Sequence, residues 1–371
     1  MASPSPLLPG GPGASPKSAK PAGAAASAAI STARQTHLPT ADVEESPIAA
    51  ADAGAVPEDE LEMASTEDGT LSASTSITSS IHQHAFENGR RFHSYKYGRY
   101  PIPNDDAEQR REDVKHAMML ELTDGKLWHA PLPADARRIL DVGTGTGIWA
   151  IEAADQLPGA EVLGVDLSPI QPKWVPSNCR FLVDDVEEEW LYGDNFDMVH
   201  MRTMASVLKD IPKVLRRAYN ALKPGGWLGM QELQAVLGCD DGTTPPNDGL
   251  AVFYRAVRTS LTKFGMDLDM PRELRPLLEE AGFVAVAHVA RKVPVGPWAA
   301  DRSLRVAGLY CREAVGDLVP AMAAKPFRAA GLSGAECEAL AAGARAALGD
   351  MSRHRYLPFH FWTAQRPLVG G

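Results

Sequence analysis

The sequence predicts an α/β protein whose central sheet has seven strands, runs mostly parallel and carries helices on both faces. Three observations support this fold class. After Pro133, short apolar runs alternate with helical segments, which is typical of a parallel sheet wound with crossover helices. A glycine-rich turn joins the first of these runs to the helix that follows it. An acidic residue stands at the end of each of the first three runs.

The first 80 residues differ in composition from the rest of the chain. The protein has seven Trp, eight Tyr and ten Phe, and the first of these in the chain is Phe86. Residues 1–80 carry ten acids against three bases, whereas residues 81–371 carry 37 acids and 34 bases. A segment rich in Ala, Ser, Pro and Gly that has no aromatic anchor cannot bury a core. Residues 1–80 are therefore predicted to form a disordered acidic tail.

Charge, hydropathy and cysteine spacing exclude several functional classes. The nearly neutral body offers no clustered positive field for phosphates, so direct nucleic-acid binding is not expected. No apolar run approaches the ~20 residues that cross a bilayer, so no membrane association is expected. The four cysteines match neither a paired metal-ligand spacing nor a dense disulfide framework: Cys179, Cys239, Cys311 and Cys337. They indicate reduced thiols, no bound metal, and a cytoplasmic or nuclear location.

Residues 81–135 are expected to form an N-terminal arm that leads into a helix over about 106–122. The stretch 87–106 interleaves aromatic residues with arginines. Such a pattern can bind single-stranded nucleic acid, but the acidic surroundings favour an arm that packs on the domain. Because a sheet of this kind leaves its ligand open to water, the arm is also a candidate lid. Arg90 or Arg91 is available there to pair with a ligand carboxylate.

Residues 136–371 are expected to form one ligand-binding α/β domain. Its predicted strands, in chain order, are 138–142, 161–165, 180–183, 196–201, 227–233, 283–289 and 354–364. Apolar residues at helical spacing predict a helix over 211–222, with Pro212 in its first turn and Lys-Pro-Gly-Gly as its stop. Further helices are predicted over 248–263 and 271–281. An insertion at about 298–348 is helical and is expected to cap the sheet.

The turn after the first predicted strand has the chemistry of a cofactor-binding loop. It reads Asp-Val-Gly-Thr-Gly-Thr-Gly over 141–147 and opens a helix, so a ligand can approach its backbone and the helix N-terminus. A dinucleotide fingerprint requires glycine at the sixth place counted from Gly143, where this chain has Ile148. The carboxylate of Asp141 would repel a pyrophosphate, but it suits a ligand with an ammonium and a sulfonium. S-adenosylmethionine has both groups.

Acidic residues also end the second and third predicted strands. Asp166 is placed to accept both hydroxyls of a ribose, and Asp185 to accept from an adenine amino group next to the donating amide of Val186. A helix-cap or turn role is the alternative for each acid taken singly. Three acids at three adjacent strand ends favour a single cofactor site. The residues predicted to bind the cofactor are Asp141, Gly143, Thr144, Gly145, Asp166, Leu167, Asp185, Val186 and Arg202.

Several sequence blocks resemble the class I methyltransferases. They are the glycine loop at 141–147, Gly-Val-Asp-Leu-Ser-Pro-Ile-Gln-Pro at 164–172, and Leu-Lys-Pro-Gly-Gly-Trp at 222–227. The blocks Glu-Asn-Gly-Arg-Arg-Phe-His at 87–93 and Tyr-Pro-Ile-Pro-Asn-Asp at 100–105 are similar, more narrowly, to the fungal LaeA-like methyltransferases of secondary metabolism. The resemblance covers about 87–367. It implies a Rossmann-like class I methyltransferase fold, S-adenosylmethionine as cofactor, and a broader paralogue rather than the founding regulator.

The catalytic residues stay unassigned at this point. Methyl transfer from a sulfonium is an in-line displacement, so alignment and exclusion of water supply much of the rate. An alcohol or amine acceptor needs a base, for which His93, His200 and Glu232 are the candidates. A histidine inside a strand, such as His200, is more often a packing residue. Arg202, just beyond that strand, is expected to touch the methionine end of the cofactor or the lid.

The resemblance leaves three hypotheses about function. The first is an S-adenosylmethionine-dependent methyltransferase that modifies a small-molecule or peptide natural product. The second is a LaeA-like nuclear regulator of secondary-metabolite gene expression that acts through protein partners. The chain lacks the basic run that is typical of nuclear import, which disfavours this second role. The third is a cofactor-binding interaction protein without turnover.

Overall fold

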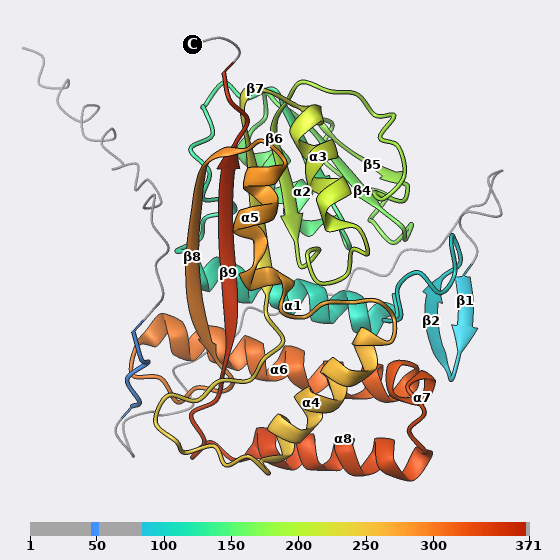
Figure 1. The fold of residues 1–371 in the computed structure, drawn as a ribbon, viewed down its shortest axis with the longest axis vertical. Helices are drawn as coiled ribbons and strands as arrows, with labels where there is room; N and C mark the ends of the chain where they lie inside the picture. Colours follow the sequence, from blue (N-terminus) through green and yellow to red (C-terminus); the bar gives the residue numbers. More distant parts are fainter. Residues whose placement is uncertain (1–45, 52–83, 369–371) are drawn as a thin grey trace, which may run out of the picture. The chain divides into compact units, whose positions relative to one another are not determined.

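Seven strands form one mixed sheet in the computed structural model, which describes residues 46–51 and 84–368 (Figure 1). The strands lie in the order β5-β4-β3-β6-β7-β9-β8. Their bounds are β3 (Arg138–Val142), β4 (Glu161–Asp166), β5 (Cys179–Val183), β6 (Phe196–Arg202), β7 (Leu222–Leu233), β8 (Val284–Pro294) and β9 (Tyr356–Gln365). Of these seven, β9 alone runs against its neighbours. The predicted seven-stranded, mostly parallel sheet is confirmed.

Eight α-helices occur in the described residues, some on the two faces of the sheet and the others in a cap. They are α1 (Asp106–Leu122), α2 (Ile148–Gln156), α3 (Ile211–Ala221), α4 (Gly249–Thr262), α5 (Leu274–Glu280), α6 (Arg302–Ala324), α7 (Pro326–Ala329) and α8 (Gly334–Gly349). Successive side chains of β3 point to opposite faces, so Leu140 packs with α3 and α5 while Ile139 packs with α2. Figure 1 shows α3 and α5 together on the near face of the sheet.

The ends of several elements differ from the sequence prediction. β7 begins at Leu222 because this residue already pairs with Phe196, before the Pro-Gly-Gly turn. The predicted helix over 271–281 is divided into a 3-10 turn (Met270–Arg272) and α5. Pro271 and Pro276 lack the amide hydrogen that a continuous helix would use, which accounts for the division.

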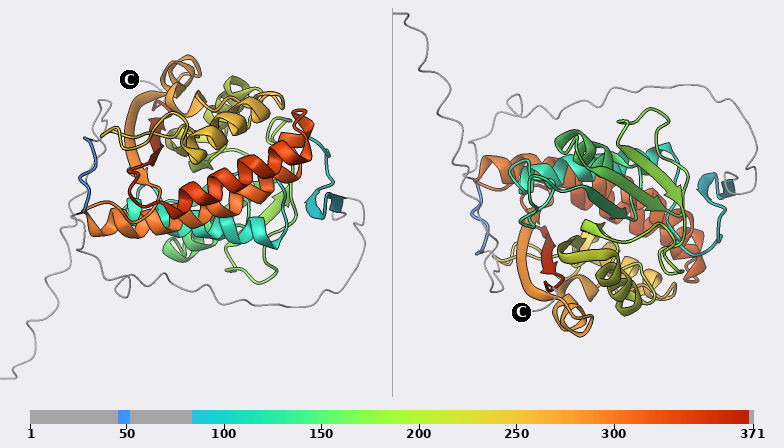
Figure 2. Two further views of the ribbon diagram at one scale, coloured as in Figure 1. Left: turned by 90° about the horizontal axis from the view of Figure 1, so that it is seen from below. Right: turned by 90° about the horizontal axis from the view of Figure 1, so that it is seen from above.

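A helical cap packs against one end of the sheet domain. It contains α6, α7 and α8 from the predicted insertion, and α4 joins them through an apolar core that includes Phe253, Val257 and Phe327. α1 and α6 lie side by side (Figure 2). Helices α4 and α8 approach closely at glycines, since a Cβ on Gly249 would lie 2.2 Å from the carbonyl oxygen of Gly343.

The arm begins with a hairpin of β1 (His84–Glu87) and β2 (Arg90–His93). Its two turn residues are Asn and Gly, both with positive φ, which is the favoured chemistry of a tight hairpin. Lys325, at the junction of α6 and α7, anchors this hairpin to the cap. Its Nζ lies 2.9 Å from a Glu87 carboxylate oxygen and 4.8 Å from the centre of the Phe92 ring.

Six residues of the predicted tail are placed in the structure. In residues 46–51, the Ala51 amide donates to the Trp298 carbonyl at 2.8 Å, and the Ala300 amide donates to the Ala49 carbonyl at 2.7 Å. The segment thus pairs with the backbone of residues 298–300 in the way that an additional β-strand pairs with the edge of a sheet. The prediction of disorder is therefore wrong for these six residues. The rest of the predicted tail lies outside the described residues.

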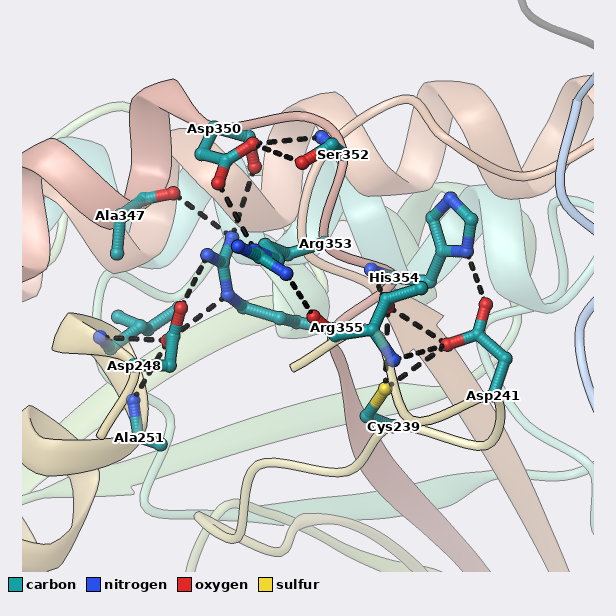
Figure 3. A network of polar contacts seen from close by, with 12 residues as sticks. Cys239, Asp241, Asp248, Ala251, Ala347, Asp350, Ser352, Arg353, His354 and Arg355 are labelled. Carbon is teal, nitrogen blue, oxygen red and sulfur yellow. Dashed lines mark hydrogen bonds and ion pairs between the residues drawn. The ribbon is translucent and has the colours of Figure 1, made fainter. Parts of the chain in front are cut away.

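A buried ion pair joins the cap to β9 (Figure 3). Arg355 is 1 % exposed, and its Nη2 and Nε lie 2.6 Å and 3.1 Å from the two carboxylate oxygens of Asp248. Asp248 also accepts from the amides of Leu250 and Ala251 and so caps α4. Arg355 Nη1 donates to the Ala347 carbonyl at 2.9 Å. The pair therefore holds the start of α4, the end of α8 and the start of β9.

All four cysteines are free. In the part of the chain that the structure describes, no helix has the length and apolar character to cross a bilayer.

Candidate functional site

A cavity of about 170 Å³ lies at the carboxyl ends of β3, β4, β5 and β6. Ligands of open α/β sheets bind at this edge because it is where the crossover loops meet. Seven of the nine predicted cofactor-binding residues line the cavity: Gly143, Gly145, Asp166, Leu167, Asp185, Val186 and Arg202. Segments far apart in the sequence therefore contribute to one site.

Asp141 and Thr144 are the two predicted residues that do not line the cavity. Asp141 is 2 % exposed, and its carboxylate accepts from the Thr144 hydroxyl at 2.6 Å. The other carboxylate oxygen lies 2.7 Å from Nδ1 of His200, whose ring stacks on Trp149 at 3.6 Å. Asp141 therefore supports the glycine loop through Thr144, and its predicted contact with the ligand ammonium stays a prediction. Its side chain lies on the α2 side of the sheet, beside His200 of β6.

The glycine loop has the backbone geometry that a close ligand approach requires. Gly143 and Gly145 have φ values of 73° and 58°, in the left-handed region that L side chains rarely adopt. A Cβ on Gly143 would lie 2.2 Å from Sδ of Met204. The amides of Gly143 and Thr144 donate to the Val165 carbonyl at 2.8 Å and 3.0 Å, which ties the loop to the end of β4.

Asp166 connects the glycine loop to the loop after β4. Its carboxylate accepts from the Gly145 amide at 2.9 Å and from the Ser168 amide at 2.8 Å. Burial at the cavity wall outweighs these hydrogen bonds and raises the pKa of Asp166 to about 6. The side chain lines the cavity, and its role as a ribose acceptor stays a prediction.

The raised pKa of Asp166 predicts that cofactor affinity depends on pH. Ribose hydroxyls donate to the ionised carboxylate, so the ligand binds the form that predominates above about pH 6. We expect a constant dissociation constant for S-adenosylhomocysteine above about pH 7 and a loss of up to tenfold per pH unit below pH 6. Calorimetric titrations from pH 8 to pH 5 measure this. Asp166→Asn is the control, and a profile equally steep in that variant would contradict the assignment.

The arm contacts the loop after β5, which the sequence predicts to bind adenine. Asp185 lies 3.0 Å from Nζ of Lys96 and 3.6 Å from Nε of Arg99. Lys96 also pairs with Glu188 at 2.7 Å, and Arg99 pairs with Glu187. The predicted adenine-binding loop and the arm are thus linked by a group of ion pairs.

The arm covers the cavity with residues other than the two arginines named from the sequence. Arg90 forms a two-point pair with Asp105, which caps α1, and Arg91 donates to the Asn104 carbonyl at 2.8 Å. Both arginines therefore stabilise the arm itself. The arm residues that line the cavity are His93, Arg99, Tyr100, Ile102, Pro103 and Asn104.

Two of the three candidate bases lie away from the cavity. Glu232 is fully buried and accepts from the amides of Met204 and Ala205 at 3.2 Å and 3.0 Å. Burial raises its pKa to about 8, but the carboxyl holds the turn after β6 and does not face a ligand. His200 is buried beneath the glycine loop. His93 lines the cavity, and burial lowers its pKa.

Helix α1 contributes a wall of the cavity that the sequence analysis missed. Glu108, Glu112 and Lys115 line the cavity from α1. Two are partners within the helix, since Lys115 Nζ lies 2.8 Å from a Glu112 carboxylate oxygen. The sequence did show charged residues three and four positions apart, which places them on one face of the helix. Such a pattern is typical of a helix face exposed to solvent, so it did not indicate a cavity.

The lining chemistry fits a cationic nucleoside ligand. Six carboxylates and three cationic side chains line the cavity: Glu108, Glu112, Asp166, Asp184, Asp185 and Glu187, against Arg99, Lys115 and Arg202. An excess of carboxylates favours a ligand with net positive charge, such as S-adenosylmethionine, and disfavours a pyrophosphate. Among the described residues, no group of three or more His, Cys, Asp or Glu side chains is arranged to hold a metal ion.

Fold and site together define a class I methyltransferase that uses S-adenosylmethionine. A family model described as a methyltransferase domain matches residues 108–288. A solved structure of phosphoethanolamine N-methyltransferase 2 from Haemonchus contortus, in complex with S-adenosylmethionine, is similar with a TM-score of 0.42 at 21% identity, over 67% of this chain and 52% of that chain.

Within this class, the chain belongs to the LaeA-like methyltransferase family. It is 37% identical to methyltransferase pytC of Aspergillus terreus, over 83% of this chain and 96% of the relative. It is 34% identical to the secondary metabolism regulator LAE1 of Cochliobolus heterostrophus, over 76% of this chain and 94% of the relative. It is 32% identical to the protein-methionine methyltransferase laeA of Emericella nidulans, over 81% of each.

Proposed function

We propose that this methyltransferase modifies a small-molecule or peptide product of fungal secondary metabolism. The observation that carries the proposal is the composition of the cavity at the strand ends. Beside the predicted cofactor groups, its lining includes apolar side chains, with Tyr100 and Ile102 from the arm and Val207 and Leu208 after β6. An apolar lining suits a hydrophobic acceptor. The relatives named for a methyltransferase and for secondary metabolism support the same role.

The chain's residues bind, orient and shield the reactants. The bound sulfonium supplies an electrophilic methyl group, and the electron pair of its broken C–S bond returns to sulfur. Asp166 holds the ribose, and the glycine loop admits the ligand to its backbone. The arm excludes water from the reacting centre, which strengthens the electrostatic contacts there. His93 is the candidate base at the cavity for an acceptor that must lose a proton.

Binding and transfer test the proposal in sequence. The protein is expected to bind S-adenosylmethionine in the micromolar range and to prefer it to a nicotinamide dinucleotide, which calorimetry measures directly. With methyl-labelled cofactor and a metabolite extract of the producing organism, label should enter one small-molecule product. Preference for the dinucleotide would overturn the reading of the site.

The regulatory alternative makes a different prediction. Relatives named as regulators support a role in secondary-metabolite gene expression through protein partners. Deleting the gene separates the two roles, because a tailoring enzyme removes one modification from one product, whereas a regulator changes the transcript levels of several biosynthetic genes. A protein that only binds the cofactor would yield no methylated product in either experiment.

A second acceptor class is a methionine thioether. The thioether of Met204 lies beside Gly143 at the cavity wall, and a relative is named a protein-methionine methyltransferase. A thioether has no proton to lose, so such a transfer requires no base. If it occurs, mass spectrometry of protein incubated with the cofactor should find one added methyl group on the peptide that contains Met204. Met204→Leu is the control and should show none.

The arm is proposed to act as a lid over the cofactor, because it lines the cavity and is linked to the adenine loop by ion pairs from Lys96 and Arg99. Hydrogen exchange should slow between residues 89 and 104 when S-adenosylhomocysteine is added, since a lid gains order on closing. An arm that packs permanently should be protected already. Unchanged exchange, together with unimpaired cofactor affinity in a chain that starts at Asp105, would contradict the lid.

A further inference from the structure

Arg202 contacts a side chain of α1, His116, that has no role in the proposed reaction so far. Its Nη1 lies 2.8 Å from Nδ1 of His116, which is 2 % exposed. A guanidinium only donates hydrogen bonds, so Nδ1 of His116 must be the acceptor. The imidazole is therefore neutral in this contact and carries its proton on Nε2.

Glu152 of α2 determines the orientation of the same imidazole from its other side. Nε2 of His116 lies 3.0 Å from a carboxylate oxygen of Glu152, whose side chain is 36% exposed. This contact with His116 lowers the pKa of Glu152. Glu152, His116 and Arg202 thus form a line from the protein surface to the cavity, with one residue each from α2, α1 and β6.

At the cavity, this row of three side chains ends in the guanidinium of Arg202, which can bind an anion. Arg202 lines the cavity beside Gly143 and Met204, at the glycine-loop end rather than at the adenine end formed by Asp185. The methionine part of the cofactor carries the carboxylate, and a guanidinium fork pairs with carboxylates through two parallel hydrogen bonds. A fork is useful only when it is held in the correct plane, and the contact with His116 restricts its rotation.

We propose that His116, oriented by Glu152, positions Arg202 on the carboxylate of the cofactor's methionine moiety. The proposal rests on the methyltransferase function and adds a positioning residue to it. Its alternative is a packing contact that holds α1 against α2 and β6 and has no relation to the ligand. The two roles predict different results when His116 is replaced. A positioning role affects only the binding of the ligand's carboxylate, whereas a packing role affects the whole ligand.

Two ligands with and without the amino-acid part separate these cases. S-adenosylhomocysteine has the carboxylate, whereas 5′-methylthioadenosine has the same nucleoside and lacks it. In the full chain, His116→Leu is expected to weaken binding of S-adenosylhomocysteine about 10- to 100-fold and to leave 5′-methylthioadenosine unchanged, because one charge-assisted contact is misplaced. Arg202→Ala should show the same selective loss. The double variant should lose no more than Arg202→Ala alone.

A conservative variant and a matched control complete the test. His116→Asn places an amide oxygen where Nδ1 stands, so it should retain affinity for S-adenosylhomocysteine within about threefold. The asparagine variant also tests the proposal if the leucine variant does not fold.

His129→Leu removes a histidine that does not line this cavity and should change the affinity for neither ligand. Equal losses for both ligands in the His116 variants would show a structural role only, and no loss for either would show that Arg202 acts unaided. Wild-type protein that binds neither ligand would instead overturn the proposed function.

Discussion

Replacing Asp166 by alanine is expected to weaken binding of S-adenosylmethionine by about 30- to 700-fold, a cost of about 2–4 kcal/mol. The ribose hydroxyls would be desolvated without their charged acceptor, and hydrogen bonds to a charged group are among the stronger ones. The structure adds a second effect, because Asp166 also accepts from the amides of Gly145 and Ser168. Removing the carboxylate leaves these donors unpaired and loosens the loop that the ligand approaches.

Two further variants separate the direct effect from the loosening. Asp166→Asn keeps an acceptor for one amide but loses the charge, so its affinity should lie between those of wild type and alanine variant. Asp184→Asn alters a neighbouring acid of the same cavity whose carboxylate accepts from the Asp185 amide, and it should cost less than tenfold. Calorimetry with S-adenosylhomocysteine measures all three. Wild-type affinity in Asp166→Ala would remove Asp166 from the site.

The largest expected loss of stability follows from Arg355→Leu. Asp248 has 5% of its side chain exposed and pairs with Arg355 through two contacts. Removing one partner leaves a buried charge without compensation, which costs about 3–5 kcal/mol. The Ala347 carbonyl at the end of α8 would also lose its donor. Because single domains are stable by only about 5–15 kcal/mol, this variant should show a large shift of its urea unfolding midpoint.

A second arginine, two residues earlier in the chain, provides a matched control. Arg353 has 38% of its side chain exposed and pairs with Asp350, which has 43% exposed, at 3.2 Å. A solvent-exposed pair contributes about 0–1 kcal/mol, so Arg353→Leu should change stability by less than 1 kcal/mol. Equal losses in the two variants would mean that Arg355 and Asp248 are not the buried pair described here. The double variant Arg355→Leu with Asp248→Asn should recover part of the loss, since it removes the unpaired charge.

The sequence predicted residues that line the cavity where glycine spacing and strand position were sufficient. Gly143, Gly145, Asp166 and Asp185 were identified because glycine spacing and acids at strand ends are local features of the chain. Parallel strands bring their carboxyl ends to one edge, so the topology placed these residues together once the alternation of strands and helices was recognised. The same reasoning correctly excluded the dinucleotide fingerprint at Ile148.

Three of the predicted site residues that lie in strands do not line the cavity. Asp141, His200 and Glu232 were placed at the right ends of the right strands, but their side chains point into the protein. His200 and Arg202 lie on the same face of β6, but only Arg202, at the end of the strand, lines the cavity. Sequence spacing does not state how near the end of a strand a side chain must lie to reach the ligand.

The sequence by itself determined the class of fold, the cofactor and the loop predicted to bind it, because these depend on local periodicity, glycine conformations and charge. Only the tertiary structure decided which side chains of distant segments line the cavity beside that loop. In the structure, Glu108, Glu112 and Lys115 of α1 line the cavity. Arg90 pairs with Asp105, and Arg99 lies at the loop that contains Asp185. The physical reason is that a charged side chain has the same local pattern whether it faces water or a cavity. Its partner comes from a segment many residues away, and the packing of distant elements alone selects it.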